Sequence, residues 1–393
     1  MIFSYFLVIE KNFQWFHFKN LSTELPSIMS KNISRKQFLK HAGTAISVAA
    51  AGFPSILLPK KRDKLGVALV GLGGYATGRL APGLKLTQHC ELRGIVTGTP
   101  SKIPRWQREY NIPDSNVYSY ETLPEVANND DIDILYIVTP PAIHARDAIR
   151  AAEAGKHVWC EKPMAMNEEE CQAIIDTAER NGVFLSIGYR MQHEPNTQTI
   201  IRYGQEKTYG EITGVQTGAG YNGAHPDPTN WRRIGRMGGG ALYDMGVYPI
   251  NAARYSTGME PIAASGRQWS ERTDMYSDVD EFTEFELEFS GGLMVKGETS
   301  FGKSVNYLNV ECTDGWYRLE PMQSYSGVQG ETSDGTQLPP DPNHQQARQM
   351  DNDALAIKEG RSPIAPGRDG LRDIQIVKAI MESSRNGGAR IEL

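Results

Sequence analysis

Residues 65–79, LGVALVGLGGYATGR, constrain the fold more than any other stretch of the chain. The first six form an apolar run that is typical of a strand covered on both faces in a parallel sheet. The run ends at a glycine-rich turn, and a helix-competent segment, 76–80, follows it. This order of strand, turn and helix predicts a dinucleotide-binding fingerprint, because such glycines let the backbone approach a pyrophosphate.

The predicted dinucleotide-binding residues of this turn are Gly71, Leu72, Gly73, Gly74, Tyr75 and Ala76. Ala76 occupies the third glycine position of the G-x-G-x-x-G pattern, where alanine is also found. Glycine turns between strand and helix are common, so the interpretation needs support from the rest of the chain. The support comes from apolar runs at 90–96, 132–138, 157–160 and 183–187 that alternate with helical patterns at 142–154 and 168–181. Such alternation predicts right-handed βαβ units in a parallel sheet.

The end of the second predicted strand indicates which dinucleotide binds. An NAD site usually has an Asp or Glu there, which binds the ribose 2′-hydroxyl. This chain has Thr97, Gly98 and Lys102 instead, with Arg105 nearby. Hydroxyls and cations suit a 2′-phosphate, which a carboxylate would repel, so the pattern favours NADP. The alternative is a solvated loop that lacks an acid by chance.

Two further strand ends carry candidate chemistry, because ligands of open α/β sheets bind at the carboxyl ends of the strands. One is Thr139-Pro140 with His144 shortly after it, although a single histidine is more often structural. The other is the pair Glu161-Lys162, which a proline follows. The proline stiffens the backbone and would hold the lysine ammonium beside a bound nicotinamide. The alternative is a surface lysine in a turn.

Asp244 and Tyr248 form a third candidate group. They are four residues apart and therefore share one face of a helix. A carboxylate, a phenol and a lysine in one pocket could remove a hydroxyl proton while a hydride leaves carbon. Tyrosine is a poor base at its ordinary pKa of about 10, but a close cation favours the phenolate. The alternative is a tyrosine that packs and an aspartate that caps a turn.

Composition limits the class of protein. The 393 residues, of which 39% are hydrophobic and 22% charged, are enough for two globular domains. A net charge of −6 argues against a nucleic-acid partner, which needs a basic face. The four cysteines have no metal-ligand spacing, so we expect free buried thiols and no metal site.

Residues 1–60 are predicted to lie outside the fold. Basic residues at 34–40 precede a mild, alanine-rich apolar run at 41–58, which is typical of an export signal. The motif resembles a twin-arginine signal in which Lys36 replaces the second arginine. It predicts a periplasmic protein with no membrane segment in its mature form. The alternative is an amphipathic helix of the mature domain.

The remaining chain divides where the pattern changes. Residues 61–188 are predicted to form the dinucleotide-binding domain, and residues 189–393 a second domain. The predicted strands of the second domain are 214–221, 262–270, 281–289, 293–300 and 307–313, the predicted helices are 197–203, 346–359 and 369–384, and 321–342 is a predicted loop. The clean period of two in 281–289 indicates an antiparallel sheet with one buried face.

Four motifs together resemble the family of glucose–fructose oxidoreductase, inositol dehydrogenase and MocA, from about residue 65 to the C-terminus. They are the glycine turn, Glu161-Lys162-Pro163, Gly188-Tyr189-Arg190 and Asp244-Met245-Gly246-Val247-Tyr248. The resemblance implies an α/β fold with an N-terminal Rossmann domain and a C-terminal α+β domain that contains a large, mainly antiparallel sheet. Many members have histidine where this chain has Tyr248, and in this respect the chain resembles the glucose–fructose oxidoreductase branch. Members of that branch are periplasmic and hold NADP tightly.

The same resemblance implies roles for individual residues. Lys162 would orient the substrate hydroxyl, Tyr248 would be the general acid/base, and Asp244 would position the sugar or tune that tyrosine. The sugar pocket would include Arg190, Trp231 and Arg232. The cofactor would contact Thr139, Pro140, His144, Glu161, Lys162 and Arg190.

The implied activity is that of an exported NADP-dependent oxidoreductase of aldose sugars. Such an enzyme could couple the oxidation of one sugar to the reduction of another. Its sheet would form the interface of a homo-oligomer, a dimer or a tetramer. Two alternatives share the motifs: a glycosidase that uses a bound nicotinamide cofactor, and a non-catalytic sugar-binding member of the family.

Overall fold

The computed structural model describes residues 63–393. Residues 1–62 lie outside the described part, and so does the predicted export signal. Within the described part, no helix is both long enough and apolar enough to cross a membrane.

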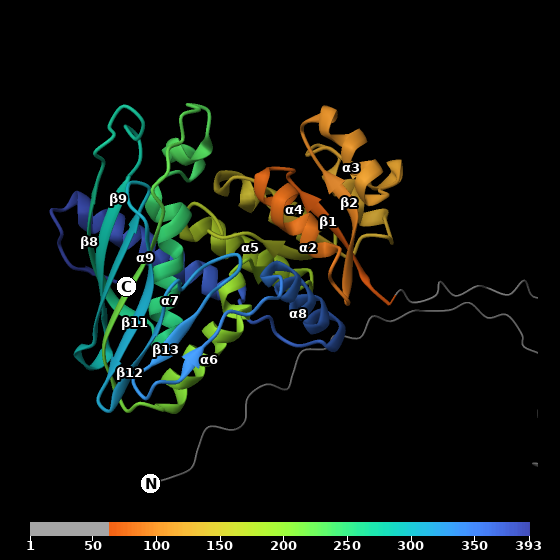
Figure 1. Ribbon diagram of the computed structural model, residues 1–393. Coiled ribbons are helices and arrows are strands. Elements are labelled where there is room, and N and C mark those ends of the chain that lie inside the picture. The colour runs from red at the N-terminus through yellow and green to blue at the C-terminus, as the bar shows by residue number, and fades with distance from the viewer. Residues whose placement is uncertain (1–62) are drawn as a thin grey trace, which may run out of the picture. The chain divides into compact units, whose positions relative to one another are not determined.

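Six parallel strands form the first sheet, in the order β3-β2-β1-β4-β5-β6. Figure 1 labels β1 and β2 of this sheet. They are β1 (Leu65–Val70), β2 (Cys90–Val96), β3 (Val117–Tyr118), β4 (Ile134–Ile137), β5 (His157–Cys160) and β6 (Leu185–Ile187). The helices between them are α2 (Ala81–Leu84), α3 (Ile103–Tyr110), α4 (His144–Glu153) and α5 (Glu168–Arg180). The strand order reverses between β1 and β4, and open α/β sheets bind ligands at such a switch point.

The register of this sheet aligns the carboxyl ends of five strands. Val70 pairs with Val96 on one side and with Ile137 on the other. Ile137 pairs in turn with Cys160, and Cys160 with Ile187. Because the strands are parallel, the segments that follow β1, β2, β4, β5 and β6 leave the sheet at the same edge.

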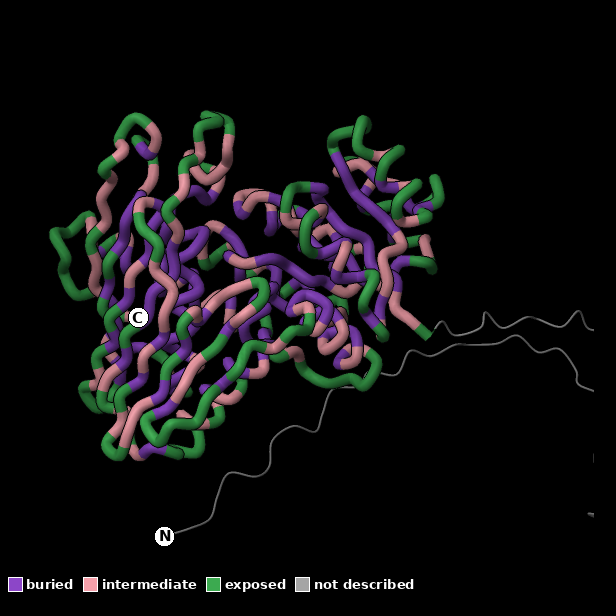
Figure 2. Tube along the Cα trace, in the orientation of Figure 1, coloured by how far each residue is buried: buried purple, intermediate pink, exposed green. Residues whose placement is uncertain are grey.

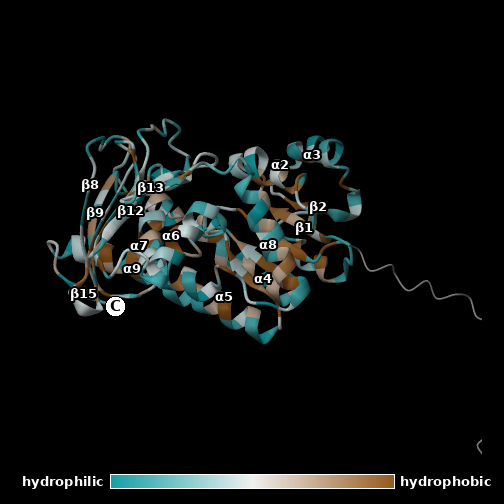
Figure 3. Ribbon diagram, turned by 60° about the horizontal axis from the view of Figure 1, so that its bottom comes forward, coloured by the Kyte–Doolittle hydropathy of each residue, from teal (hydrophilic) through white to brown (hydrophobic). Residues whose placement is uncertain are grey.

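Both faces of the first sheet are buried. Val67 and Leu69 of β1 belong to a core cluster that includes Met350 of α8 (Gln345–Glu359), while Val70 belongs to a second, larger cluster. Figure 2 shows these strands buried along most of their length, and Figure 3 shows apolar residues concentrated on them. Burial on both faces explains why the strands are continuous apolar runs in the sequence.

Nine strands form the second sheet, in the order β14-β13-β12-β11-β7-β10-β9-β8-β15. They are β7 (Ile212–Gly220), β8 (Pro261–Trp269), β9 (Phe282–Phe289), β10 (Met294–Ser300), β11 (Val305–Cys312), β12 (Gly315–Leu319), β13 (Gly330–Thr332), β14 (Gln337–Leu338) and β15 (Ile391–Glu392). Neighbouring strands are antiparallel except β7 and β10.

Helices pack against one face of this sheet. They are α7 (Val247–Thr257), which contacts β7 and β10, and α9 (Gly367–Arg385), which contacts β8; α6 (Pro195–Glu206) packs against α7. In β9, Phe285 and Leu287 are buried, whereas Glu284 and Glu286 are exposed. The opposite face therefore carries charged side chains.

The fold class that the sequence predicts is confirmed, and the elements that were not predicted include the helix α3 and several short strands. The predicted loop 321–342 contains β13 and β14, and β3, β12 and β15 were not predicted. Apart from β12, these strands have two or three residues, too few for an alternating pattern. The parallel pair β7–β10 joins strands that are distant in sequence, which the residue pattern does not reveal. The predicted helix at 76–80 is a π-helical turn that continues into α2.

The cysteines are unpaired, and Cys90, Cys160 and Cys171 are buried. Across residues 63–393 there is no cluster of three or more His, Cys, Asp or Glu side chains that could hold a metal ion.

Candidate active site

A cavity of about 790 Å³ opens where the first sheet has its aligned carboxyl ends. This volume is in the range of cofactor and small-molecule sites. Both sheets contribute to its walls. The lining residues are Gly71, Leu72, Gly73, Gly74, Tyr75, Gly78, Arg79, Thr97, Thr99, Lys102, Tyr120, Val138, Thr139, Pro140, Pro141, His144, Glu161, Lys162, Tyr221, Trp231, Arg232, Asp244, Met245, Tyr248, Gln323 and Tyr325.

Most of the predicted site residues line this cavity, but Ala76, Gly98 and Arg190 do not. Ala76 is fully buried in the core beneath the turn, where a small residue allows helix and strand to pack closely. Gly98 is exposed, and a Cβ there would lie 3.0 Å from the ring of Tyr120. These two residues therefore shape the site without facing it.

The glycine turn has the geometry that a pyrophosphate needs. Gly71 has a φ of +99°, and a Cβ there would lie 3.0 Å from Thr139 Cγ2 and 3.1 Å from the Val138 carbonyl oxygen. Glycine is the residue that accepts this φ and this close approach without strain. At Gly73 and Gly74 no atom lies within 4 Å of the place a Cβ would take, so their backbone is open toward the cavity.

The end of β2 provides hydroxyls and an ammonium group. Thr97 is buried, and its Oγ1 accepts a hydrogen bond from the Thr99 amide (3.1 Å). Lys102 Nζ donates to the Leu72 carbonyl (2.8 Å), which anchors the ammonium beside the glycine turn. Arg105, in contrast, does not line the cavity and pairs with the exposed Glu109 (3.4 Å). The expectation that Arg105 supports a 2′-phosphate is therefore not met.

Lys162 links the end of β5 to the second domain. It follows β5, and a cis peptide joins it to Pro163. Its Nζ donates to the backbone carbonyl of Asp244 (2.6 Å) and lies 3.9 Å from the Asp244 carboxylate. The same nitrogen is 4.5 Å from the centre of the Tyr248 ring. The three residues predicted to be catalytic are thus in contact.

Arg232 holds the Asp244 carboxylate through two hydrogen bonds. Its Nε donates to Oδ2 (2.7 Å) and its Nη2 to Oδ1 (3.4 Å). Burial alone would raise the pKa of Asp244, but the charges of Arg232 and Lys162 outweigh it and keep the pKa below its ordinary value. Asp244 is therefore an anion at neutral pH, in contact with two cations.

Tyr248 lies near two positive charges. It is the second residue of α7, which continues directly from a π-helical segment, Leu242–Gly246. The Lys162 ammonium is 4.5 Å from the centre of its ring, and the guanidinium carbon of Arg190 is 5.4 Å from the same point. Both distances are within the range of a cation–π contact.

Glu161 lines the cavity but is mostly buried. Tyr136 donates a hydrogen bond from its hydroxyl to Glu161 Oε1 (2.7 Å). Burial raises the pKa of Glu161, although Tyr136 and Lys162 act in the opposite direction. Gly188, which follows β6, leaves room for this carboxylate, because a Cβ there would lie 2.7 Å from Oε1.

His144 and Arg190 support the walls of the cavity. The His144 ring is 2.6 Å from the Thr139 carbonyl oxygen and 3.0 Å from that of Pro163, so it joins the ends of β4 and β5. Burial lowers the pKa of His144. Arg190 is only 2% exposed and donates to the Ser324 carbonyl (2.6 Å). Arg190 was predicted to contact the sugar and the cofactor directly, but it does not line the cavity and instead lies beside the Tyr248 ring.

Sequence reasoning missed Arg79, Tyr120, Tyr221, Gln323 and Tyr325, which also line the cavity. Tyr221 follows β7 directly, so its place at a strand end was a usable signal. Tyr325 lies in the segment predicted to be a loop, and its surroundings depend on tertiary contacts alone.

This combination of fold and site defines a nicotinamide-dinucleotide-dependent oxidoreductase with a Rossmann domain. Two family models match the chain: "Oxidoreductase family, NAD-binding Rossmann fold" over residues 65–189, and "GFO/IDH/MocA C-terminal domain" over residues 197–318. The chain belongs to the Gfo/Idh/MocA family of oxidoreductases.

Relatives of the chain act on sugars. The crystal structure of aldose-aldose oxidoreductase from Caulobacter crescentus, complexed with glycerol, is 35% identical with a TM-score of 0.80, covering 84% of this chain and all of that one. D-xylose 1-dehydrogenase [NADP(+)] from Haloarcula marismortui is 28% identical over 328 residues, 81% of this chain and 90% of that protein. A second NADP-dependent D-xylose 1-dehydrogenase, from Haloferax volcanii, is 26% identical over 82% of this chain and 98% of its own length.

We expect Arg232→Met to lower stability in a pH-dependent way. The folded-state pKa of Asp244 is below its unfolded value, so the ionised carboxylate contributes stability that is present above the unfolded pKa and lost as the pH falls through the folded pKa. In the variant only Lys162 remains beside this carboxylate. The loss in unfolding free energy should be about 2 kcal/mol at pH 7 and shrink toward pH 3, as measured by urea unfolding.

Arg318→Met is the matched control, because the Arg318–Glu331 pair is exposed. It should change the unfolding free energy by less than about 1 kcal/mol. A loss in Arg232→Met that does not depend on pH would contradict the assignment.

Proposed function

We propose that this protein is an NADP-dependent oxidoreductase that acts on aldose sugars by hydride transfer between a sugar carbon and C4 of the nicotinamide. The observation that carries the proposal is the contact among Lys162, Asp244 and Tyr248 in the same cavity as the glycine turn. The similarity to an aldose-aldose oxidoreductase and to two D-xylose dehydrogenases supports the substrate class.

The cofactor end of the cavity fits NADP. Gly71 provides the tight turn, and Gly73 and Gly74 present open backbone. Thr97 and Lys102 stand where an NAD-specific site has a carboxylate, so a 2′-phosphate would meet a hydroxyl and a cation rather than a negative charge. When bound, the nicotinamide accepts or returns the hydride, which no side chain can do.

Tyr248 takes the proton of the sugar hydroxyl when the sugar is oxidised and returns it on reduction. The Lys162 ammonium, beside the ring, orients that hydroxyl and stabilises the charge that develops on its oxygen. Asp244 acts through Lys162: its backbone carbonyl accepts a hydrogen bond from the ammonium, and its carboxylate lies 3.9 Å from the same nitrogen. Arg232 fixes that carboxylate in turn.

The other end of the cavity suits a polyhydroxylated ring. Trp231 presents an aromatic face, with the Arg232 guanidinium carbon 4.4 Å from its ring centre. Tyr221 adds a hydroxyl that is held 2.8 Å from His225 Nε2. We further propose that one aldose is oxidised and a second is reduced in this cavity while the cofactor stays bound, in line with the name of the aldose-aldose oxidoreductase.

Lys162→Ala and Tyr248→Phe should each lower kcat for aldose oxidation about a hundredfold or more, because each removes a group that handles the hydroxyl proton. The absorbance of the reduced nicotinamide measures the rate. Tyr209→Phe is the control, since its hydroxyl bonds Asp334 outside the cavity and its loss should leave kcat unchanged. Near-native kcat in either site variant would refute the mechanism.

Release of an aglycone from a nitrophenyl glycoside without net redox change would instead identify a glycosidase.

Lys102→Ala should raise the Kd for NADP about tenfold and leave the Kd for NAD unchanged, because only NADP carries the 2′-phosphate. Fluorescence titration of the native protein should also give tighter binding of NADP than of NAD. Lys85→Ala, which removes an exposed cation outside the cavity, is the matched control. Equal affinities of the native protein for the two dinucleotides would overturn the NADP assignment.

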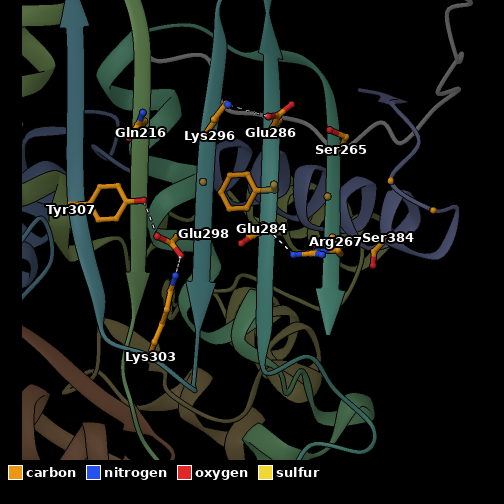
Figure 4. Close-up of a pocket in the computed structure, with 15 residues that line it drawn as sticks. Gln216, Ser265, Arg267, Glu284, Glu286, Lys296, Glu298, Lys303, Tyr307 and Ser384 are labelled. Atoms are coloured by element: carbon orange, nitrogen blue, oxygen red, sulfur yellow. Dashed lines mark hydrogen bonds and ion pairs between the residues drawn. The ribbon is translucent and has the colours of Figure 1, made fainter. Parts of the chain in front are cut away.

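We also propose that the open face of the nine-stranded sheet binds a second copy of the chain, as the family resemblance implies. Figure 4 shows polar and charged side chains on this face. They line a depression of about 740 Å³. Lys296 pairs with Glu286 (3.7 Å) and Arg267 with Glu284 (3.2 Å). Charges of both signs allow a two-fold related copy to be complementary.

Light scattering should therefore give the native protein the mass of a dimer or tetramer. Glu286→Lys, which places like charges beside Lys296, should shift the mass toward the monomer, whereas a native monomer would contradict the proposal.

Export to the periplasm remains a proposal from residues 34–58 alone, and N-terminal sequencing of the mature protein tests it.

A further inference from the structure

A side chain from the second half of the chain reaches the glycine turn of the first. Tyr325 lies between β12 and β13 and lines the cavity. The guanidinium carbon of Arg79, which follows the turn, is 4.1 Å from the centre of the Tyr325 ring, and that of Arg190 is 4.6 Å from it. The ring of Tyr75, within the turn, is 6.1 Å away. Tyr325 therefore contacts the predicted pyrophosphate site, through Arg79 and Tyr75, and also Arg190, which lies beside Tyr248.

The segment that carries Tyr325 is anchored from behind. Arg190 donates to the Ser324 carbonyl and to the Gln323 side-chain oxygen, both at 2.6 Å. Asn306 of β11 brackets Gln323, donating to its carbonyl (2.6 Å) and accepting from its amide (2.9 Å). These bonds hold the base of the loop against the second sheet.

The contact of the Tyr325 ring with Arg79 lies at the surface, unlike the hydrogen bonds that anchor the loop. Arg79 is exposed, and Tyr325 is 40% exposed. The two meet by stacking of a guanidinium on a ring, which is worth roughly a few-fold to tenfold in an equilibrium at such a site. This contact can separate without exposing the core, while the anchored base of the loop stays in place.

We propose that Tyr325 is a positioning residue that closes the cavity over the bound dinucleotide, so that release of the cofactor requires Tyr325 to separate from Arg79. The proposal rests on the proposed function, since it needs a dinucleotide on the glycine turn. Sugars enter at the end of the cavity where Tyr221 and Trp231 lie, and a closed Tyr325 retains the cofactor while they exchange.

Retention decides which acceptor receives the hydride. The first aldose loses a hydride from its anomeric carbon and a proton from its hydroxyl, which forms a lactone. With the cofactor retained, the carbonyl of a second aldose gains both and becomes an alditol. With rapid release, the reduced cofactor leaves and the enzyme is a simple dehydrogenase. Tyr325 thus sets the balance between these two outcomes.

The test is the rate at which NADPH leaves the full-length protein, followed by fluorescence after displacement with excess NADP. Tyr325→Ala should speed release about tenfold, and Tyr325→Phe, which keeps the ring, should stay within about twofold of native. Tyr110→Ala is the matched control, because it removes a ring stacked by Lys85 (4.5 Å) outside the cavity and should not change release. Arg79→Met should act like Tyr325→Ala, and the double variant should be no faster than either single one.

A second readout separates this role from a merely structural one. In Tyr325→Ala, turnover that couples two sugars should fall while turnover with added NADP rises, because release no longer limits exchange. Unchanged release in both Tyr325→Ala and Arg79→Met, with NADPH bound by the native protein, overturns this proposal alone. A native protein that binds no NADPH overturns the proposed function. Since Arg79 is exposed, its variant keeps the test valid even if Tyr325→Ala folds poorly.

Discussion

Parallel hydrogen bonding between β1, β4 and β5 is the constraint on which the cavity depends. It pairs Val70 with Ile137 and Ile137 with Cys160, so that the next residues of each strand emerge side by side. A shift of one residue in either pairing would turn the end of that strand to the opposite face and move Lys162 away from the glycine turn. Burial on both faces holds the register, because it leaves no room for the alternative.

A second constraint is the pairing of charges between the end of β5 and two helical segments of the second domain. Lys162, Asp244 and Arg232 are held together at the cavity, and each would be costly to bury alone. The pairing therefore does two things at once: it attaches the second half of the chain to the end of β5, and it holds an ammonium group beside Tyr248. Stability and proposed chemistry rely on the same contacts.

The long elements were predictable, since their signals are local. Strands β2 and β5 begin and end where their apolar runs do, and the Glu-Lys-Pro and Asp-x-x-x-Tyr motifs lie where the patterns of the two domains place them. The misses have a common cause. Strands such as β13 and β14 are too short for a period, and they exist because a neighbouring strand accepts their hydrogen bonds. Arg190 was predicted to face the ligands, but its partners Gln323 and Ser324 come from a distant loop.

The sequence by itself determined the class of the protein: a glycine turn between strand and helix, an acid missing at the end of β2, and a lysine pinned after β5 are local features with local physical causes. Tertiary structure alone decided which side chains meet. It placed Tyr325 against Arg79, moved Arg190 behind Tyr248 and paired Asp244 with Arg232. The reason is that these contacts join elements that are far apart in the chain. A sequence pattern indicates which face of an element is buried, but not which distant residue packs against that face.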